Sequence, residues 1–228
     1  MHSTFVTCVP TLLLGVASVL AAPLTPDEAI ASDSVYVTPH DRYSSSVGVL
    51  GCKIDTNRVA YWPGSVDCTN ICIEVSYAGR SVKLLRVDQS GGAFDISYDA
   101  WNILVTGESA RTHPVPGGGI AATYVNLPMS ECVAAGLVHG GKLAFTGANS
   151  MNFLAACHAQ PGSWVANNYV IYNIYNPTCT LGYDEVCTLD WATQNQATCP
   201  HQLGAMPPLT SQPVVDIIYP SGQEAVAP

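Results

Sequence analysis

Basic residues are scarce in this chain of 228 residues, which has eight Lys and Arg against seventeen Asp and Glu. The formal net charge of −9 argues against an electrostatic nucleic-acid binder, because phosphate contacts need a basic face. The same deficit disfavours adhesion to anionic lipid. We therefore expect no nucleic-acid or membrane partner, whereas an uncharged ligand such as a neutral polysaccharide is compatible with this charge.

Long apolar runs are also missing, apart from one near the start of the chain. This run, from about residue 9 to residue 20, is too short to span a bilayer comfortably. Ala21 and Ala22 follow it, and small residues at this point fit cleavage by signal peptidase. We predict a signal peptide over residues 1–22 and hence a secreted protein, located outside the cell or in the cell wall. The alternative is a buried N-terminal helix.

Motifs for several common chemistries are absent. The chain has no Gly-x-Ser-x-Gly elbow and no His-Glu-x-x-His pair. Its triglycine, at residues 117–119, lacks the Lys and the strand–helix setting of a phosphate loop. We expect no cofactor, and we do not expect N-glycosylation because Pro177 interrupts the sequon at Asn176.

Cysteine is plentiful by comparison. One of the nine, Cys8, lies in the predicted signal peptide, so an even set of eight remains. Such a set in a secreted chain implies up to four disulfides, whose pairing the sequence does not determine. A zinc site is the competing interpretation, but Cys68-x-x-x-Cys72 has no second pair at suitable spacing, so we expect no metal. The eight cysteines are Cys52, Cys68, Cys72, Cys132, Cys157, Cys179, Cys187 and Cys199.

Short apolar segments separated by glycine turns dominate residues 46–132. One of them alternates cleanly, with Ile73 and Val75 on one face, and residues 81–88 carry apolar side chains on both faces. Ser97 is a natural N-cap for one short helix. This pattern is typical of a small β-barrel. We expect residues 23–45 to form a polar linker or arm, and residues 133–228 to form a cysteine-containing extension that disulfides attach to the barrel.

Two carboxylates flank a glycine hinge within the barrel segment, Asp88 at the end of a strand and Asp95 after the hinge. The stretch from Val87 to Trp101 resembles the signature of expansins and rare-lipoprotein-A-like proteins. Residues 119–127 are similar to the closing strand of that domain. The resemblance implies a six-stranded double-psi β-barrel in a secreted protein, and the organisation suggests a fungal source.

By this resemblance, Asp95 matches the general acid of the small inverting endoglucanases that share the barrel. Asp88 matches an aspartate in the binding groove of bacterial expansins. The general base of those endoglucanases follows an Arg-Tyr-Trp run, and here Pro63 follows Tyr61 and Trp62. Two further departures occur at Ser90, where the family often has an aromatic residue, and Ala93, where the plant proteins often have a histidine.

Inverting hydrolysis needs two carboxyls roughly 6.5–9.5 Å apart. We expect Asp88 to lie beside Asp95 rather than across a sugar from it, and Asp67 to reach the groove only if its loop folds back. The remaining groove would bind sugar through stacking on Tyr61 and Trp62 and through hydrogen bonds to Asp88, Ser90 and Asp95. The alternatives are that Tyr61 and Trp62 belong to the core, that Asp95 caps the helix, and that Asp88 is a turn residue.

Together these observations predict a secreted, monomeric, expansin-like protein that binds or loosens cell-wall polysaccharide without hydrolysing it. The polymer is cellulose, chitin or a peptidoglycan-like glycan. Two alternatives remain, namely a secreted interaction or effector protein that uses the barrel as a scaffold, and a weak inverting endoglucanase.

Overall fold

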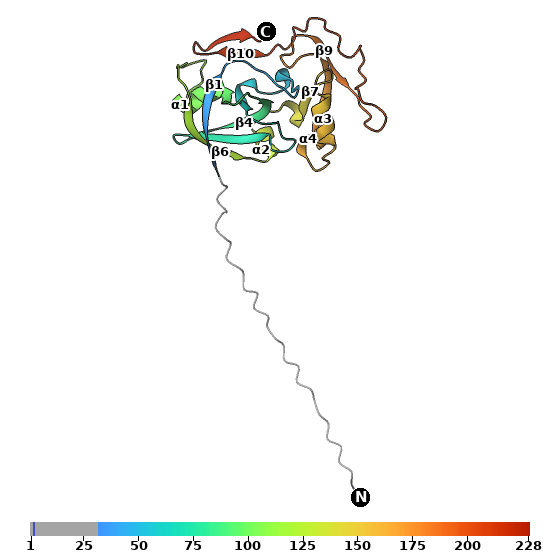
Figure 1. The fold of residues 1–228 in the computed structure, drawn as a ribbon, viewed down its shortest axis with the longest axis horizontal. Coiled ribbons are helices and arrows are strands. Elements are labelled where there is room, and N and C mark those ends of the chain that lie inside the picture. Colours follow the sequence, from blue (N-terminus) through green and yellow to red (C-terminus); the bar gives the residue numbers. More distant parts are fainter. Residues whose placement is uncertain (1, 3–31) are drawn as a thin grey trace. The chain divides into compact units, whose positions relative to one another are not determined.

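The computed structural model describes residue 2 and residues 32–228, so the predicted signal peptide and residues 23–31 of the predicted arm lie outside the described residues. The described part is mainly β (Figure 1). Its elements in chain order are β1 (Asp33–His40), η1 (Gly51–Lys53), η2 (Thr56–Arg58), β2 (Val59–Trp62), β3 (Cys72–Tyr77), β4 (Arg80–Gln89), β5 (Phe94–Ser97), α1 (Tyr98–Thr106), β6 (Ile120–Asn126), α2 (Met129–Ala134), η3 (His139–Gly141), β7 (Leu143–Thr146), α3 (Met151–His158), α4 (Trp164–Asn167), β8 (Tyr169–Ile174), β9 (Gly182–Cys187), β10 (Val215–Ile218) and β11 (Gln223–Val226), where η denotes a 3-10 helix.

Six strands close into a barrel in the order β1-β5-β2-β4-β3-β6. Strand β1 is parallel to β5 and β2 is parallel to β4, whereas the other neighbours are antiparallel. The predicted fold class, a mainly β six-stranded barrel with a disulfide-bonded extension, is therefore confirmed. The double-psi connection of the strands remains a prediction.

Strand β1 corrects one predicted boundary. Residues 33–40 fall in the segment that the sequence assigns to a linker or arm, so the barrel begins well before residue 46. The strand fills the place between β5 and β6, which would otherwise both be open edges. The sequence signal is weak because Pro39 interrupts the apolar pattern that Val35 and Val37 begin.

The barrel interior holds one of the two large buried clusters. Every barrel strand contributes to it, and α1 adds Tyr98, Trp101 and Leu104. Along β4 it takes the side chains of Val82 and Leu84, which alternate with outward-facing residues as the pleat requires. The residues that the strands supply are Val37, Ala60, Trp62, Ile73, Val75, Val82, Leu84, Ile96 and Ala122.

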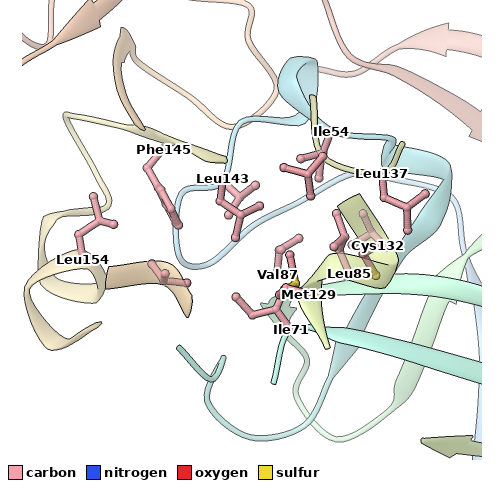
Figure 2. Close-up of a cluster of buried hydrophobic side chains, with 14 of the residues drawn as sticks. Ile54, Ile71, Leu85, Val87, Met129, Cys132, Leu137, Leu143, Phe145 and Leu154 are labelled. Atoms are coloured by element: carbon pink, nitrogen blue, oxygen red, sulfur yellow. The ribbon is translucent and has the colours of Figure 1, made fainter. Parts of the chain in front are cut away.

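The second large cluster lies between the outer face of the barrel and the extension, and we call it the seam. Leu85 and Val87 enter it from β4, while Leu143, Phe145 and Leu154 enter it from the extension. Figure 2 shows these side chains converging from both parts of the chain. Both faces of β4 are therefore apolar because one faces the interior and the other faces the seam.

The extension adds two small sheets and two short helices. Strands β7, β8 and β9 form one sheet, and β10 and β11 form a hairpin. An isolated bridge between Val49 and Phe145 joins the barrel segment to β7. The described residues 32–228 belong to a single compact unit, so the extension does not behave as a separate domain.

All eight cysteines predicted to pair do so, in four disulfides. Two of the bonds join the barrel segment to the extension, one lies within the barrel segment and one lies within the extension. Cys68 and Cys72 therefore have separate partners, and neither thiolate is available to a metal. The pairs are Cys52–Cys179, Cys68–Cys157, Cys72–Cys132 and Cys187–Cys199.

Candidate functional site

The two predicted site carboxylates lie in one row across three neighbouring strands. Tyr61 on β2 pairs with Asp95 on β5 on one side and with Asp88 on β4 on the other. Adjacent strands lie about 4.8 Å apart, so the two aspartate backbones are separated by roughly 10 Å. The expectation that Asp88 lies directly beside Asp95 is therefore wrong, because β2 runs between their strands.

Asp95 is partly exposed, and one of its carboxylate oxygens accepts no hydrogen bond from any described residue. Its Oδ1 accepts a hydrogen bond from the hydroxyl of Thr38, the residue opposite it on β1. Among the described residues no donor contacts Oδ2, which leaves that oxygen able to accept from a ligand hydroxyl. The alternative role as helix cap does not apply, since Ser97 is the N-cap residue of α1.

Asp88 binds the loop that follows β1. Its Oδ1 accepts from the backbone N–H of Ser46 at 2.6 Å and of Gln89 at 2.8 Å, and its Oδ2 accepts from the hydroxyl of Ser44. Ser45 reinforces the contact by donating to the carbonyl of Val87 at 2.7 Å. Both carboxylate oxygens are thus occupied by residues that tie the segment after β1 to the end of β4.

Tyr61 and Trp62 cannot serve as an exposed platform for sugar rings, which corrects their predicted role. Their exposed fractions are 3% and 1%, respectively. Tyr61 lies in the seam against the ring of His40, with ring centroids 4.4 Å apart, and burial raises the pKa of its hydroxyl. Trp62 lies in the barrel interior, where it packs edge-on against Tyr124.

Ser90 does not extend toward a ligand either. Its hydroxyl donates to the carbonyl of Ala93 and accepts weakly from the N–H of Gly92 at 3.4 Å, so it closes its own glycine turn. Asp67 behaves in the same way, because it accepts from the N–H groups of Thr69 and Asn70 at 2.6 Å each. Its carboxylate stabilises its own loop.

Sequence reasoning missed the partners of both carboxylates. Thr38 and Ser44 lie in the segment that was predicted to be a linker or arm, and Ser46 is the first residue of the predicted barrel segment. They are far from Asp88 and Asp95 in sequence, with separations of 42 to 57 residues. A prediction that β1 is a barrel strand would have placed Thr38 next to Asp95.

A partly buried ion pair supports the helix that follows Asp95. Asp99 on α1 accepts from Arg58 at 2.8 Å, from the hydroxyl of Ser109 at 2.5 Å and from the N–H of Ala110 at 2.8 Å. Burial alone would raise the pKa of Asp99, but the bonds from Ser109 and Arg58 outweigh it and lower the pKa. Asp99 is therefore a structural carboxylate.

Asp216 on β10 is a second buried carboxylate with a different environment. It accepts from the N–H of Tyr43 at 2.9 Å and lines a small polar pocket that also contacts Tyr61. Burial, aided by the nearby charge of Asp41, raises the pKa of Asp216. The pocket, of about 10 Å³, has room for roughly one water molecule and not for a sugar.

Other classes of site find little support within residues 32–228. No group of three or more His, Cys, Asp or Glu side chains lies together there as metal ligands would. No helix in the described part is long and apolar enough to cross a membrane.

Comparisons with known proteins add a weak structural likeness. No family model matches the chain, and neither does any curated protein. Among solved structures, the chain is similar to the solution structure of the fungal elicitor Cerato-Platanin, with 17% identity and a TM-score of 0.30, over 44% of this chain and 98% of that chain. A likeness of this size carries no conclusion about function, so the function must be argued from the residues of this chain.

Proposed function

We propose that this chain is a secreted protein that binds uncharged cell-wall polysaccharide without hydrolysing it, in the manner implied by its resemblance to expansins. The observation that carries the proposal is the unequal use of the two site carboxylates. Asp95 keeps an oxygen available to a ligand, whereas hydrogen bonds from the chain occupy both oxygens of Asp88.

The commitment of the two other candidate carboxylates supports the non-hydrolytic part. Inverting hydrolysis needs a base that can hold and deprotonate a water molecule across the sugar ring from the acid. Asp88 is committed to Ser44 and Ser46, and Asp67 is committed to its own turn. Pro63 has no carboxylate to offer at the position where the related endoglucanases have their base.

Secretion is supported by the disulfides. Four disulfides form and persist in an oxidising environment and are rare in the cytosol. The net charge of −9 fits an uncharged ligand better than an anionic one. Loosening of the wall, as distinct from binding, would follow from competition for hydrogen bonds between polymer chains.

A second candidate function is that of a secreted interaction protein with the barrel as scaffold. The observation in its favour is the seam, because the extension covers the barrel face that carries Tyr61. A barrel face covered in this way has less room for a polymer, and recognition would then fall to the surface of the extension.

Sedimentation with insoluble cellulose, chitin and peptidoglycan tests the proposal. We expect the full chain to bind at least one of these polymers and to release no reducing sugar from it. Binding to none of them would overturn the proposal and favour the interaction protein. Release of reducing sugar by the wild type, abolished in Asp95→Asn, would instead establish a hydrolase.

A further inference from the structure

A cleft with no ionisable side chain in its lining lies at the junction of the barrel and the extension. Its volume is about 600 Å³, within the ~300–1,000 Å³ range of small-molecule sites. It is lined from the barrel side by Thr69, Asn70 and Asn126, and from the extension side by Trp164, Asn167 and Asn168, among others. None of the predicted site residues lines it.

The carboxamides of the cleft are available to a ligand. Asn70 and Asn126 are exposed, and their side chains make no hydrogen bond to any described residue. The amino group of Asn167 donates to the carbonyls of Pro161 and Ser163, at 2.8 and 2.9 Å. The amide oxygen of Asn167 is thereby held in place without a partner of its own among the described residues.

Asn168 is arranged in the same way, and an indole lies beside it. The amino group of Asn168 donates to the carbonyl of Trp164 at 2.9 Å, which leaves its amide oxygen as an acceptor. Trp164 is partly exposed and begins helix α4 next to the N-cap residue Ser163. Amide groups that bond hydroxyls, together with an aromatic face on which a ring packs, are the chemistry that binds a sugar.

The walls of the cleft are fixed before any ligand arrives. The disulfide Cys68–Cys157 joins the loop of Asn70 to α3, and the N–H of Val165 donates to the carbonyl of Cys68 at 3.0 Å. Asp67 holds the same loop through the N–H groups of Thr69 and Asn70. A preorganised site loses less entropy when it binds, which favours affinity for a weakly interacting neutral ligand.

The composition of the lining discriminates against charged ligands. A second cavity of about 600 Å³ is lined by Asp55, Arg111 and His139, so charged groups are available elsewhere on the surface. A third cavity, of about 540 Å³, is lined by amides that include Asn195 and by the phenol ring of Tyr175, but by no indole. The junction cleft alone among these three combines amides with a tryptophan.

We infer that the junction cleft is the binding site for a short stretch of uncharged saccharide. The inference rests on the proposed function and adds to it that the extension supplies half of the site. Of the barrel row of Asp88, Tyr61 and Asp95, only the free oxygen of Asp95 then remains as a further contact for the polymer, and the extension is required for binding as well as for stability.

Isothermal titration of the full chain with neutral hexasaccharides of cellulose, chitin and β-1,3-glucan tests the inference. Gly162 lines the cleft and has open space around its α-carbon, so Gly162→Leu fills the cleft without clashing with the fold. Gly118, in the loop before β6, has the same open surroundings and provides the matched control Gly118→Leu. Each variant is compared with the wild type by thermal unfolding to confirm that it folds.

We expect at least one hexasaccharide to bind, and we expect Gly162→Leu to weaken that binding tenfold or more while Gly118→Leu leaves it unchanged. Asn126→Ala, which removes one exposed amide, should weaken it about two- to tenfold. Wild-type affinity in Gly162→Leu would overturn the inference, and a loss in Asn195→Ala without a loss in Gly162→Leu would move the site to the third cavity.

The failure of the inference is distinguishable from that of the proposed function. A wild type that sediments with an insoluble polymer but binds no hexasaccharide, or that loses binding in Asp95→Ala and not in Gly162→Leu, overturns the cleft alone. A wild type that binds neither polymer nor hexasaccharide overturns both.

Discussion

The barrel interior and the seam are both buried, but they are assembled in different ways. The interior is built from alternate residues of strands that pair directly with one another. The seam joins residues that are remote in sequence, such as Leu85 and Leu154, and no continuous ladder of strands runs through it. Instead, two disulfides, side-chain packing and scattered backbone hydrogen bonds such as the Val49–Phe145 bridge hold its two sides together.

This difference shows which interactions position the extension against the barrel. A strand in the barrel is positioned by a continuous ladder of backbone hydrogen bonds, whatever its outward side chains are. The extension is positioned mainly by side-chain packing and two disulfides, with only scattered backbone hydrogen bonds to the barrel segment. The buried carboxylates of the two parts also differ in their partners. Asp99 in the barrel segment has Arg58 as a counter-ion, whereas Asp216 in the extension accepts only one backbone N–H from the described residues.

The largest expected effect comes from removing a disulfide that crosses the seam. Cys68 and Cys157 are 89 residues apart, and Cys187 and Cys199 are 12 apart. By the chain-entropy relation these bonds contribute roughly 4.6 and 2.9 kcal/mol. Replacing the first pair by serines should therefore lower the free energy of unfolding more than replacing the second, as measured by denaturant titration. Equal losses would show that loop closure is not what the seam disulfide contributes.

A matched pair on β4 compares the two clusters directly. Leu84 faces the interior and Leu85 faces the seam, and each has an exposed fraction of 0%. Leu84→Ala and Leu85→Ala should each cost about 2–5 kcal/mol through lost burial and a cavity. Because both clusters belong to one compact unit, calorimetry should show a single transition in each variant. An earlier, separate transition in Leu85→Ala alone would mean that the extension unfolds independently.

Removal of Asp99, the carboxylate of the barrel segment that pairs with Arg58, should have the next largest effect on the free energy of unfolding. Asp99→Ala leaves Arg58 without its counter-ion and should cost about 3 kcal/mol at neutral pH. Because the folded-state pKa of Asp99 is lowered, this stabilisation is present above the unfolded-state pKa of about 3.9 and is lost as the pH falls through the folded-state value. Denaturant titrations at pH 7 and pH 2 measure the difference, and the exposed neighbour Glu108→Ala is the control. A cost that is the same at both pH values would contradict the role of the charge.

The smallest change in stability is expected at Asp216, the buried carboxylate of the extension. Its sign is opposite to that at Asp99, because here loss of the charge should stabilise the fold. The raised folded-state pKa of Asp216 means that ionisation weakens the fold as the pH rises through that value. Asp216→Asn keeps an oxygen for the N–H of Tyr43 and removes the charge. Relative to the wild type, the variant should gain melting temperature between pH 3 and pH 7. A difference that does not change with pH would show that the charge of Asp216 has no influence on stability.

The candidate site was predicted only in part. The positions of Asp88 near the end of a strand and of Asp95 just after a glycine hinge follow from the local pattern, and the structure places both on barrel strands. Their spacing does not follow from it, because they are seven residues apart in sequence and yet β2 runs between their strands. The burial of Trp62 likewise depends on Phe94 and Tyr124, which reach it only when the barrel closes.

The sequence by itself determined the mainly β class, most barrel strands, helix α1 and the even set of cysteines, because alternation, glycine turns and composition are local properties. Only the tertiary structure decided the disulfide pairing, the first barrel strand, the seam and the junction cleft. Each of these depends on which distant residues meet, for example Asn126 of β6 and Trp164 of α4 in the cleft. Such contacts form only when the barrel closes and the extension packs against it, and no short stretch of sequence encodes them.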